Sequence, residues 1–438
     1  MRFCILAFYL GAMICSAGAE TRRPNILIIT TDDQGYADLS CMGSKDIRTP
    51  NLDALARRGA LCIAFYSNSP VCSPSRAALL TGRYPAQTGV TSILSSTRHT
   101  KGLRPDVPTM ASVLKEHGYN TFHCGKWHLG SAEGSRPMDR GFNRMFGFYS
   151  GCIDFYSHLY YWSSANPTHD LWEDGKEVWH NGEYLTDLIT EKAITAIEGS
   201  GDRPFFGYVA YNAPHYPLHA PAEVVEKFEH LPAERRMMAA MLWVVDQGVG
   251  RIVQRLENLG KLENTLIFFM SDNGPSRESR NWLDGNTSEF HGGSAEPWRG
   301  AKFTLWEGGI RVPAIFYWPA RIPEGQTIEV PMMAVDVFPT VLAAAGVNKV
   351  PGLAGVNLLP LLESGVAPKS RDFFWEHAGE VAMRREEWKL LLRKNGDAML
   401  VNLKRDPGET RDVKPENPAL AQEMKERALE WRAAVAQD

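Results

Sequence analysis

Short, continuous apolar runs alternate with amphipathic stretches along most of the chain. The run over 25–31 reads Asn-Ile-Leu-Ile-Ile-Thr-Thr, and similar runs cover 205–211 and 265–271. Uninterrupted runs of this length are typical of parallel strands that are buried on both faces. Between the last two runs, apolar residues recur every three or four positions from Met238 to Leu259. This spacing predicts a long amphipathic helix, which Gly260 ends.

Proline and glycine mark the ends of further elements. Pro50 opens a predicted helix that Gly59 ends, and a strand is predicted over 60–66. A helix over 110–116 stops at Gly118 and leads into a strand over 119–124. Strands that alternate with helices predict an α/β fold, in which a mostly parallel sheet is covered by helices on both faces.

The pattern changes after about residue 367. Segments 381–392 and 399–403 look like strands around the turn Lys394-Asn395-Gly396-Asp397, which is typical of a hairpin, and a last helix is predicted over 418–435. We therefore predict a main domain over residues 20–366 and a small α+β subdomain, an antiparallel sheet with a helix, over 367–438.

Residues 1–19 have the pattern of an export signal. Arg2 precedes an apolar run over 3–14, and Ala17-Gly18-Ala19 offers a small-residue cleavage site. The run is too short to span a bilayer. A lipoprotein signal at Cys15 is the alternative, but the residues before it match such a signal poorly. We predict a signal peptide over 1–19, no membrane span, and export to the periplasm, the medium or a lysosome-like compartment.

Cysteine usage and net charge narrow the functional classes. Of the 7 cysteines, Cys4 and Cys15 lie in the predicted signal, which leaves an odd number in the mature chain. One thiol is therefore expected to be neither paired nor simply structural. The other four cysteines either form disulfides or stay buried as thiols, and they are Cys41, Cys62, Cys124 and Cys152. A formal net charge of −4 gives no basic excess for binding nucleic acid.

Acidic and amide residues follow two of the predicted strands directly. Asp32 and Asp33 come after the run over 25–31, and Asp272 and Asn273 come after the run over 265–271. Ligands gather at the carboxyl ends of strands in open α/β sheets. Either pair alone is equally well explained as a turn former or helix cap. Together, three carboxylates at one edge need a cation, and an all-oxygen set suits calcium or magnesium.

The run Cys72-Ser73-Pro74-Ser75-Arg76 is the sharpest motif in the chain. Pro74 suits the first turn of a helix, so Cys72 is expected near a helix N-terminus, where the dipole stabilises an oxyanion. A buried structural cysteine or a low-pKa thiol explains an isolated motif of this kind equally well.

The chain around these residues resembles the type I, formylglycine-dependent sulfatases, in which the motif cysteine is oxidised to formylglycine. The resemblance covers nearly the whole mature chain and rests on several motifs in the same order. They are Pro24 to Asp33, Cys72 to Arg83, Gly125 to Gly130, Ala213-Pro214-His215, Ser271 to Gly274, Arg299 to Lys302 and Glu307 to Pro313. The family has an alkaline-phosphatase-like α/β fold.

The resemblance implies a role for each matching residue. Asp32, Asp33, Asp272 and Asn273 would bind one calcium ion together with an oxygen of the modified residue 72. Arg76 and Lys126 would hold the aldehyde hydrate and the sulfate, and His128 would take the hydrate proton. His215 and Lys302 would bind sulfate and protonate the leaving oxygen. A hydroxyl of the hydrate attacks sulfur in this mechanism, and the second hydroxyl later expels sulfate.

The residue types support this chemistry, although each alone has a plainer explanation. Lys126 and His128 are two apart at a predicted strand end, so their side chains are expected on one face. Cations suit the sulfate oxygens, and a histidine can protonate an alkoxide. Taken singly, Lys126 is explained as a solvated lysine, and His128 and His215 are explained as histidines of the core.

The substrate is expected to be a sulfated carbohydrate or an aryl sulfate. The segments 153–162 and 170–175 are rich in aromatic residues and resemble arylsulfatases and N-acetylgalactosamine-4-sulfatases. Ser157 and His158 are candidate substrate contacts, while the aromatic residues fit sugar binding and packing of the sheet edge equally well. A formylglycine-generating or sulfatase-maturing enzyme is the implied partner. The alternatives are a phosphodiesterase or phosphonate monoester hydrolase of the same superfamily, and a non-catalytic protein that binds sulfated glycans.

Overall fold

The computed structural model describes residues 23–160, 167–278, 289, 291–348 and 350–436. The predicted signal peptide lies outside these residues. Within the described ranges, no helix combines the length and apolarity needed to cross a membrane.

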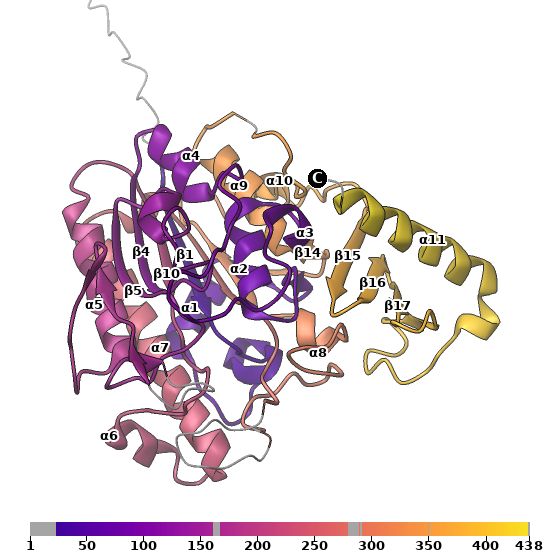
Figure 1. Cartoon of the computed structure of the whole chain (residues 1–438), viewed down its shortest axis with the longest axis horizontal. Coiled ribbons are helices and arrows are strands. Elements are labelled where there is room, and N and C mark those ends of the chain that lie inside the picture. Colours follow the sequence, from indigo (N-terminus) through magenta and orange to yellow (C-terminus); the bar gives the residue numbers. More distant parts are fainter. Residues whose placement is uncertain (1–22, 161–166, 279–288, 290, 349, 437–438) are drawn as a thin grey trace, which may run out of the picture.

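A large sheet of ten strands runs through the main body, and its central strands are parallel (Figure 1). β1 pairs in parallel with β10 and β11, and β4 pairs in parallel with β10 and β5. This confirms the predicted mostly parallel sheet, with antiparallel strands toward both edges. In spatial order the strands are β13 (Gln326–Ile328), β2 (Ala60–Cys62), β12 (Ala314–Tyr317), β11 (Thr265–Ser271), β1 (Asn25–Thr31), β10 (Phe205–Ala210), β4 (Asn120–Lys126), β5 (Arg144–Phe148), β8 (Trp172–Glu173) and β9 (Lys176–Glu177).

Both faces of the sheet are covered, which explains the continuous apolar runs. Along β1, Ile26 and Ile28 join the core on one face, while Leu27 and Ile29 join the core on the other. Because side chains alternate between faces, a strand that is buried on both must be apolar throughout.

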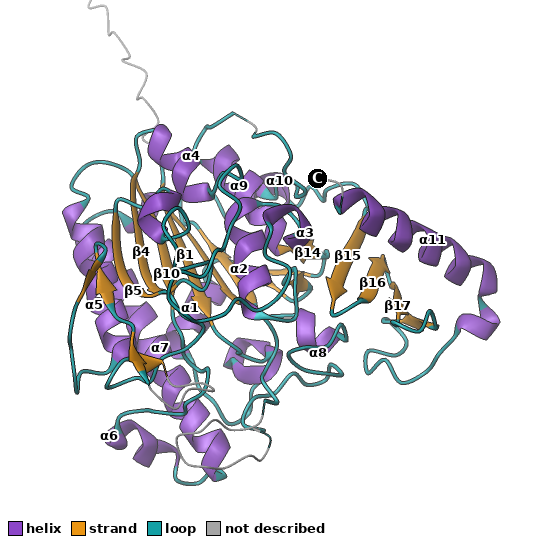
Figure 2. Cartoon of the chain, in the orientation of Figure 1, coloured by secondary structure: helices purple, strands orange, loops and turns teal. Residues whose placement is uncertain are grey.

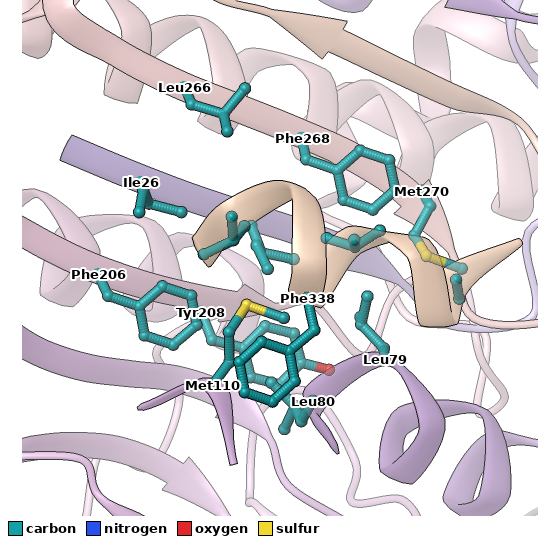
Figure 3. Close-up of a cluster of buried hydrophobic side chains, with 14 of the residues drawn as sticks. Ile26, Leu79, Leu80, Met110, Phe206, Tyr208, Leu266, Phe268, Met270 and Phe338 are labelled. Carbon is teal, nitrogen blue, oxygen red and sulfur yellow. The ribbon is translucent and has the colours of Figure 1, made fainter. Parts of the chain in front are cut away.

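Two groups of helices cover these faces (Figure 1). One core takes its apolar side chains from α2 (Cys72–Thr81), α4 (Met110–Glu116), α9 (Val337–Ala344) and α10 (Leu359–Ser364). Figure 3 shows Phe338 of α9 and Leu79 and Leu80 of α2 in the cluster that also contains Tyr208 and Phe268 of the sheet. The opposite core takes its side chains from α1 (Pro50–Arg57), α5 (Leu185–Gly199) and α7 (Ala233–Asn258).

The C-terminal subdomain is an antiparallel sheet covered by a helix (Figure 2). Its core contains Phe374, Met383, Leu390 and Leu400 of the strands together with Met424 of the helix. The predicted helix over 418–435 is confirmed, whereas the domain boundary at 366/367 stays a prediction. The elements are β15 (Asp372–His377), β16 (Glu380–Arg385), β17 (Trp388–Leu392), β18 (Ala398–Asn402) and α11 (Pro418–Val435).

Two predicted strands are wrong in extent. The segment 381–392 forms two strands, because Glu386 adopts a left-handed φ of 51° and reverses the chain between β16 and β17. The segment 60–66 is divided into β2 and β3 (Phe65–Tyr66), and β3 pairs with β14 (Met332–Met333) in a separate small sheet. β15 was not predicted from the sequence.

The remaining short elements connect the longer strands and helices. They are not confined to the ends of the sheet, because Lys414–Glu416 contacts β18 and α11, and α6 contacts α7. The elements are β6 (Leu159–Tyr160) paired with β7 (Thr168–His169), α3 (Pro85–Thr88), α6 (Ala222–Val225) and α8 (Glu307–Ile310), with 3₁₀ turns at Tyr36–Asp38, Ser40–Met42, Pro137–Arg140, Glu226–Phe228, Leu262–Asn264, Ala334–Asp336 and Lys414–Glu416.

Candidate active site

The parallel register of β1 and β11 brings the predicted oxygen ligands to one sheet edge. Thr31 pairs with Ser271, and the Asp272 amide donates to Thr31 O at 3.0 Å. The Asp33 amide donates to Asp272 Oδ1 at 3.2 Å, and Asn273 Nδ2 donates to Asp33 Oδ1 at 2.7 Å. The four predicted ligands therefore lie together, as the strand ends indicated.

Helix α2 begins at Cys72 and is fastened to the same edge. Ser75 Oγ donates to Asp272 O at 2.5 Å, and Arg76 Nε donates to Asp272 Oδ2 at 2.9 Å. Arg76 Nη1 also donates to Lys126 O at 3.2 Å. The N-terminus of α2 is thus held beside the acids, and Cys72 lies at its first position as predicted.

Lys126 and His128 reach the site, but not by strand alternation. β4 ends at Lys126, and His128 adopts a left-handed φ of 52° in the following loop. The expectation that both side chains share a strand face is therefore wrong. Lys126 Nζ lies 2.6 Å from Asp32 Oδ2, whereas His128 Nδ1 lies 3.3 Å from Cys72 Sγ and its Nε2 lies 3.1 Å from Leu94 O.

Lys302 and His215 approach from the other side. Lys302 Nζ lies 2.9 Å from Asp33 Oδ2 and 2.7 Å from Glu278 Oε2. His215 Nε2 lies 3.5 Å from the same Asp33 oxygen. We call the buried group of Asp32, Asp33, Arg76, Lys126, His215, Asp272, Asn273 and Lys302 the active-site cluster.

Burial and neighbouring charges shift the pKa values in this cluster. Burial opposes ionisation of Asp32, but Lys126, His215 and Arg76 hold its pKa well below the usual range. Burial and the charge of Asp32 raise the pKa of Asp272 to about 7. Burial and the charge of Lys126 lower the pKa of His128, so this imidazole is neutral and able to accept a proton.

Two buried oxygens test whether the cluster fits a metal ion. Asp32 Oδ1 and Asn273 Oδ1 accept no hydrogen bond from the described part of the chain. One ligand atom each from Asp32, Asp33 and His215 lie within 4.8 Å of one another. Carboxylate and amide oxygens are the donors that calcium and magnesium prefer, and buried acceptors of this kind need a partner. The residues present therefore fit a hard divalent cation.

The structure adds two residues that the motifs did not indicate. Glu278 pairs with Lys302, and Tyr208 OH lies 3.3 Å from Arg76 Nη1. Tyr208 lies in an apolar strand, and Glu278 lies outside all of the sequence motifs. No local pattern therefore indicated either residue.

Ser157 and His158 belong to a neighbouring turn. Ser157 N donates to Asp154 Oδ1 at 2.7 Å, and its hydroxyl donates to Asp154 Oδ2. Burial lowers the pKa of His158 to about 4. Within the described ranges, no hydrogen bond or ion pair joins either residue to the active-site cluster. Their contact with substrate stays a prediction, and Tyr161 and Trp162 of the same aromatic segment lie outside the described residues.

The cysteines between residues 41 and 152 are all free thiols in the structure. Cys62, Cys72, Cys124 and Cys152 are buried, and Cys41 is partly exposed. Of the two fates that the sequence left open for Cys41, Cys62, Cys124 and Cys152, the structure shows unpaired thiols.

Comparison with known proteins agrees with this arrangement. A family model described as Sulfatase matches residues 24–347, and one described as N-sulphoglucosamine sulphohydrolase, C-terminal, matches residues 298–434. Arylsulfatase G of Rattus norvegicus is 35% identical over 399 residues, which cover 83% of this chain and 74% of that protein. Arylsulfatase J of Mus musculus is 32% identical over 404 residues, which cover 85% of this chain. The chain spans 65% of the length of that mouse protein, less than two thirds.

A solved structure extends the likeness to three dimensions. The crystal structure of Ps i-CgsB in complex with k-i-k-neocarrahexaose superposes with a TM-score of 0.85 at 34% identity, covering 94% of this chain and 93% of that one. The family match spans both strand ends and the Cys72 motif that build the site. This chain therefore belongs to the sulfatase family.

Proposed function

We propose that this chain hydrolyses sulfate esters of a sulfated carbohydrate, with a formylglycine made from Cys72 and one bound calcium ion. One contact carries the proposal. Cys72 lies at the start of α2, beside the active-site cluster, and its Sγ is 3.3 Å from His128 Nδ1. Lys126, Lys302 and Arg76 supply the positive charge that a sulfate group needs. Membership of the sulfatase family supports the same reaction.

An unmodified Cys72 is poorly suited to act as the nucleophile. Burial raises the pKa of its thiol, although Lys126 and Lys302 oppose the rise, so the thiol stays protonated near neutral pH. An aldehyde at this position would instead give a hydrate with two hydroxyl groups, so that one hydroxyl could take the sulfate and the second could later expel it.

Calcium would be held by Asp32, Asp33, Asp272 and Asn273. When bound, calcium and the hydrated aldehyde supply a Lewis acid and a hydroxyl nucleophile beside the sulfate. The chain's own residues do the remaining work. Arg76 fixes Asp272 through its guanidinium, and Lys126 balances the charge of Asp32.

Proton transfer is divided between two sides of the site. His215 and Lys302 lie on the Asp33 side, where they protonate the leaving alcohol oxygen and hold the sulfate. His128 lies on the Cys72 side, where its neutral imidazole accepts a proton from the hydroxyl at position 72. The two histidines thus serve different oxygens.

Mass spectrometry of residue 72 tests the proposal directly. We expect the active protein to contain formylglycine in the peptide that carries residue 72, and full activity with only unmodified cysteine would reject it. Turnover of an aryl sulfate is compared with that of the matching aryl phosphate. A preference for the phosphate would favour a phosphodiesterase or phosphonate hydrolase, and binding without turnover of either would favour a glycan-binding protein.

The substrate class and cellular route complete the proposal. A sulfated carbohydrate is supported by the likeness to Ps i-CgsB, which was solved with k-i-k-neocarrahexaose. The pattern of residues 1–19 supports export, and the Cys72 motif supports encounter with a formylglycine-generating or sulfatase-maturing enzyme. Screening sulfated mono- and disaccharides identifies the sugar.

A further inference from the structure

A groove of about 490 Å³ separates the main body from the C-terminal subdomain. Asn68, α3 and Thr91-Ser92 line one wall, and residues 375–379 with Trp431 line the other. In Figure 1, α2 and α3 lie on one side of this region, and β15 and α11 lie on the other. The volume falls in the range of ordinary ligand sites.

Both walls are fixed to loops that carry residues of the active site. Trp375 Nε1 donates to Ser67 O at 2.7 Å, next to the groove residue Asn68 in the segment that leads into Cys72. The ring of His377 lies 6.1 Å from that of Phe303, which follows Lys302 directly. The Phe303 amide donates to Pro70 O at 3.0 Å. Both walls of the groove therefore contact segments that carry Cys72 and Lys302.

Aromatic rings form a rigid surface at the far end of the groove. The Trp431 ring stacks on Phe374 with centroids 5.0 Å apart and an interplanar angle of 6°. The edge of Tyr84 meets Trp431 at 5.0 Å with an angle of 75°. Because packing already holds these rings, a ligand that binds them loses little side-chain entropy.

The rest of the lining offers neutral polar groups. Thr91 and Ser92 are exposed hydroxyl residues. Asn68 is 1% exposed, and its Oδ1 accepts the Val335 amide at 3.0 Å, while its Nδ2 has no hydrogen-bond partner in the described part of the chain. A buried amide donor of this kind needs an acceptor, which a ligand oxygen or a water molecule can supply.

Charge distinguishes the groove from a smaller pocket that residues 95–99 help to line. That pocket is lined by Arg98 and Arg136, together with the rings of Tyr149 and Trp172. The groove, as far as its described lining goes, contains neither lysine nor arginine, and Glu376 is its acidic residue. Although the Lys394 side chain lies beside Gly379, the described lining itself offers an anionic group no lysine or arginine, whereas hydroxyl groups and ring faces would find partners.

We propose that this groove binds uncharged sugar units of the carbohydrate chain whose sulfate group reaches Cys72, an inference that rests on the proposed function. The enzyme would then act on a sulfated unit within, or at the end of, a longer chain. Rings next to the cleaved sulfate would be recognised through stacking and hydroxyl hydrogen bonds. A neighbouring unit that carries its own sulfate would be disfavoured.

Filling the groove tests the proposal without removing a packed side chain. Ser92→Trp adds a ring at an exposed position in the groove, and Val366→Trp is the matched control at a 60% exposed position elsewhere. The substrates are the best-cleaved sulfated monosaccharide from a screening panel and the same sugar extended by two unsulfated units. We expect Ser92→Trp to lower kcat/KM about tenfold on the extended substrate, with the monosaccharide unaffected. Val366→Trp should change neither.

Reversing the one acid of the groove gives an independent test. Glu376→Lys should shift preference toward extensions that carry a sulfate, because a cation now faces them. Equal kcat/KM losses on short and extended substrates in Ser92→Trp, or unchanged preference in Glu376→Lys, would overturn the groove assignment. Failure of the proposed function is distinct, because then the wild-type protein cleaves neither the sulfated monosaccharides nor their extended forms.

Discussion

The charged groups around Asp32 and those around Glu307 are both buried. They differ in how closely hydrogen-bond donors and cations approach their oxygen atoms. Glu307 at the start of α8 and Lys389 and Glu409 of the C-terminal subdomain are all fully buried. We call these residues, with Tyr66 and Arg384, the interdomain cluster. Lys389 Nζ lies 2.9 Å from one oxygen of each glutamate.

Every carboxylate oxygen of Glu307 and Glu409 lies within 2.9 Å of a donor or a cation. Among the described residues, however, Glu409 Oε1 has only the ion pair with Lys389 and no hydrogen bond. Tyr66 OH donates to Glu307 Oε2 at 2.5 Å, and the Glu307 amide donates to Glu409 Oε2 at 2.6 Å. Arg384 donates to the Tyr66 hydroxyl. Although burial opposes ionisation, Lys389, Arg384 and Arg311 lower the pKa of Glu307 to about 2.

The active-site cluster holds two acceptors less closely. Within the described part of the chain, Asp32 Oδ1 and Asn273 Oδ1 accept no hydrogen bond, and Arg76 Nη2 lies 3.7 Å from Asp32 Oδ1. A satisfied buried network fixes one arrangement of the chain, whereas an unsatisfied one has capacity for a further partner. The comparison therefore assigns structural work to the interdomain cluster and ligand binding to the active-site cluster. The predictions below test this division.

The largest effect is expected from Cys72→Ala. Loss of the nucleophile should lower kcat/KM by about 10⁴-fold or more. Stability should change little, because the side chain is small and no described disulfide involves it. Activity assays and thermal unfolding of the same preparation measure kcat/KM and stability. A large fall in the unfolding temperature would assign Cys72 a structural role.

Lys389→Met should have the opposite profile. Two buried glutamates would face each other without their shared cation, which is expected to lower the free energy of unfolding by about 3–5 kcal/mol. Lys414→Met, at a half-exposed ion pair of 3.9 Å with Asp412, is the control and should cost under about 1 kcal/mol. Urea titrations measure both, and equal effects would refute a structural role for the interdomain cluster.

Calcium should stabilise the wild-type protein through the active-site cluster alone. At a calcium concentration about 100 times Kd, the free energy of unfolding should rise by about 2.7 kcal/mol. Asp272→Ala should abolish this increment together with activity, whereas Lys389→Met should retain it. An undiminished increment in Asp272→Ala would place the ion elsewhere, and activity after verified removal of calcium would exclude its role.

The smallest effect separates the two histidines inside the active site. His215→Ala should lose about tenfold more activity on a sulfated sugar than on an aryl sulfate, because a phenolate leaves without a proton. His128→Ala should slow both substrates similarly, since it serves the hydroxyl at residue 72 and not the leaving group. Steady-state kinetics with both substrates test this difference. If His128→Ala discriminated between the substrates and His215→Ala did not, the roles of the two histidines would be exchanged.

Local pattern predicted the parts of the fold whose burial is either uniform or regularly periodic along the chain. The apolar run over 25–31 is β1, the run over 265–271 is β11, and the periodic stretch around Met238 to Leu259 is α7. The segment 381–392 was mispredicted as one strand, because its turn at Glu386 carries no glycine or proline. Intrinsic turn signals are weak where a neighbouring strand imposes the reversal.

The sequence by itself determined the sulfatase motifs and the strand ends that carry the candidate calcium ligands, because these depend on short stretches of chain. Only the tertiary structure decided which charges meet: Lys126 with Asp32, Lys302 with Asp33 and Glu278, and Lys389 with Glu307 and Glu409. Strand register, loop conformations such as the left-handed His128, and the docking of the C-terminal subdomain set these contacts. They join residues far apart in the chain, so no local pattern encodes them.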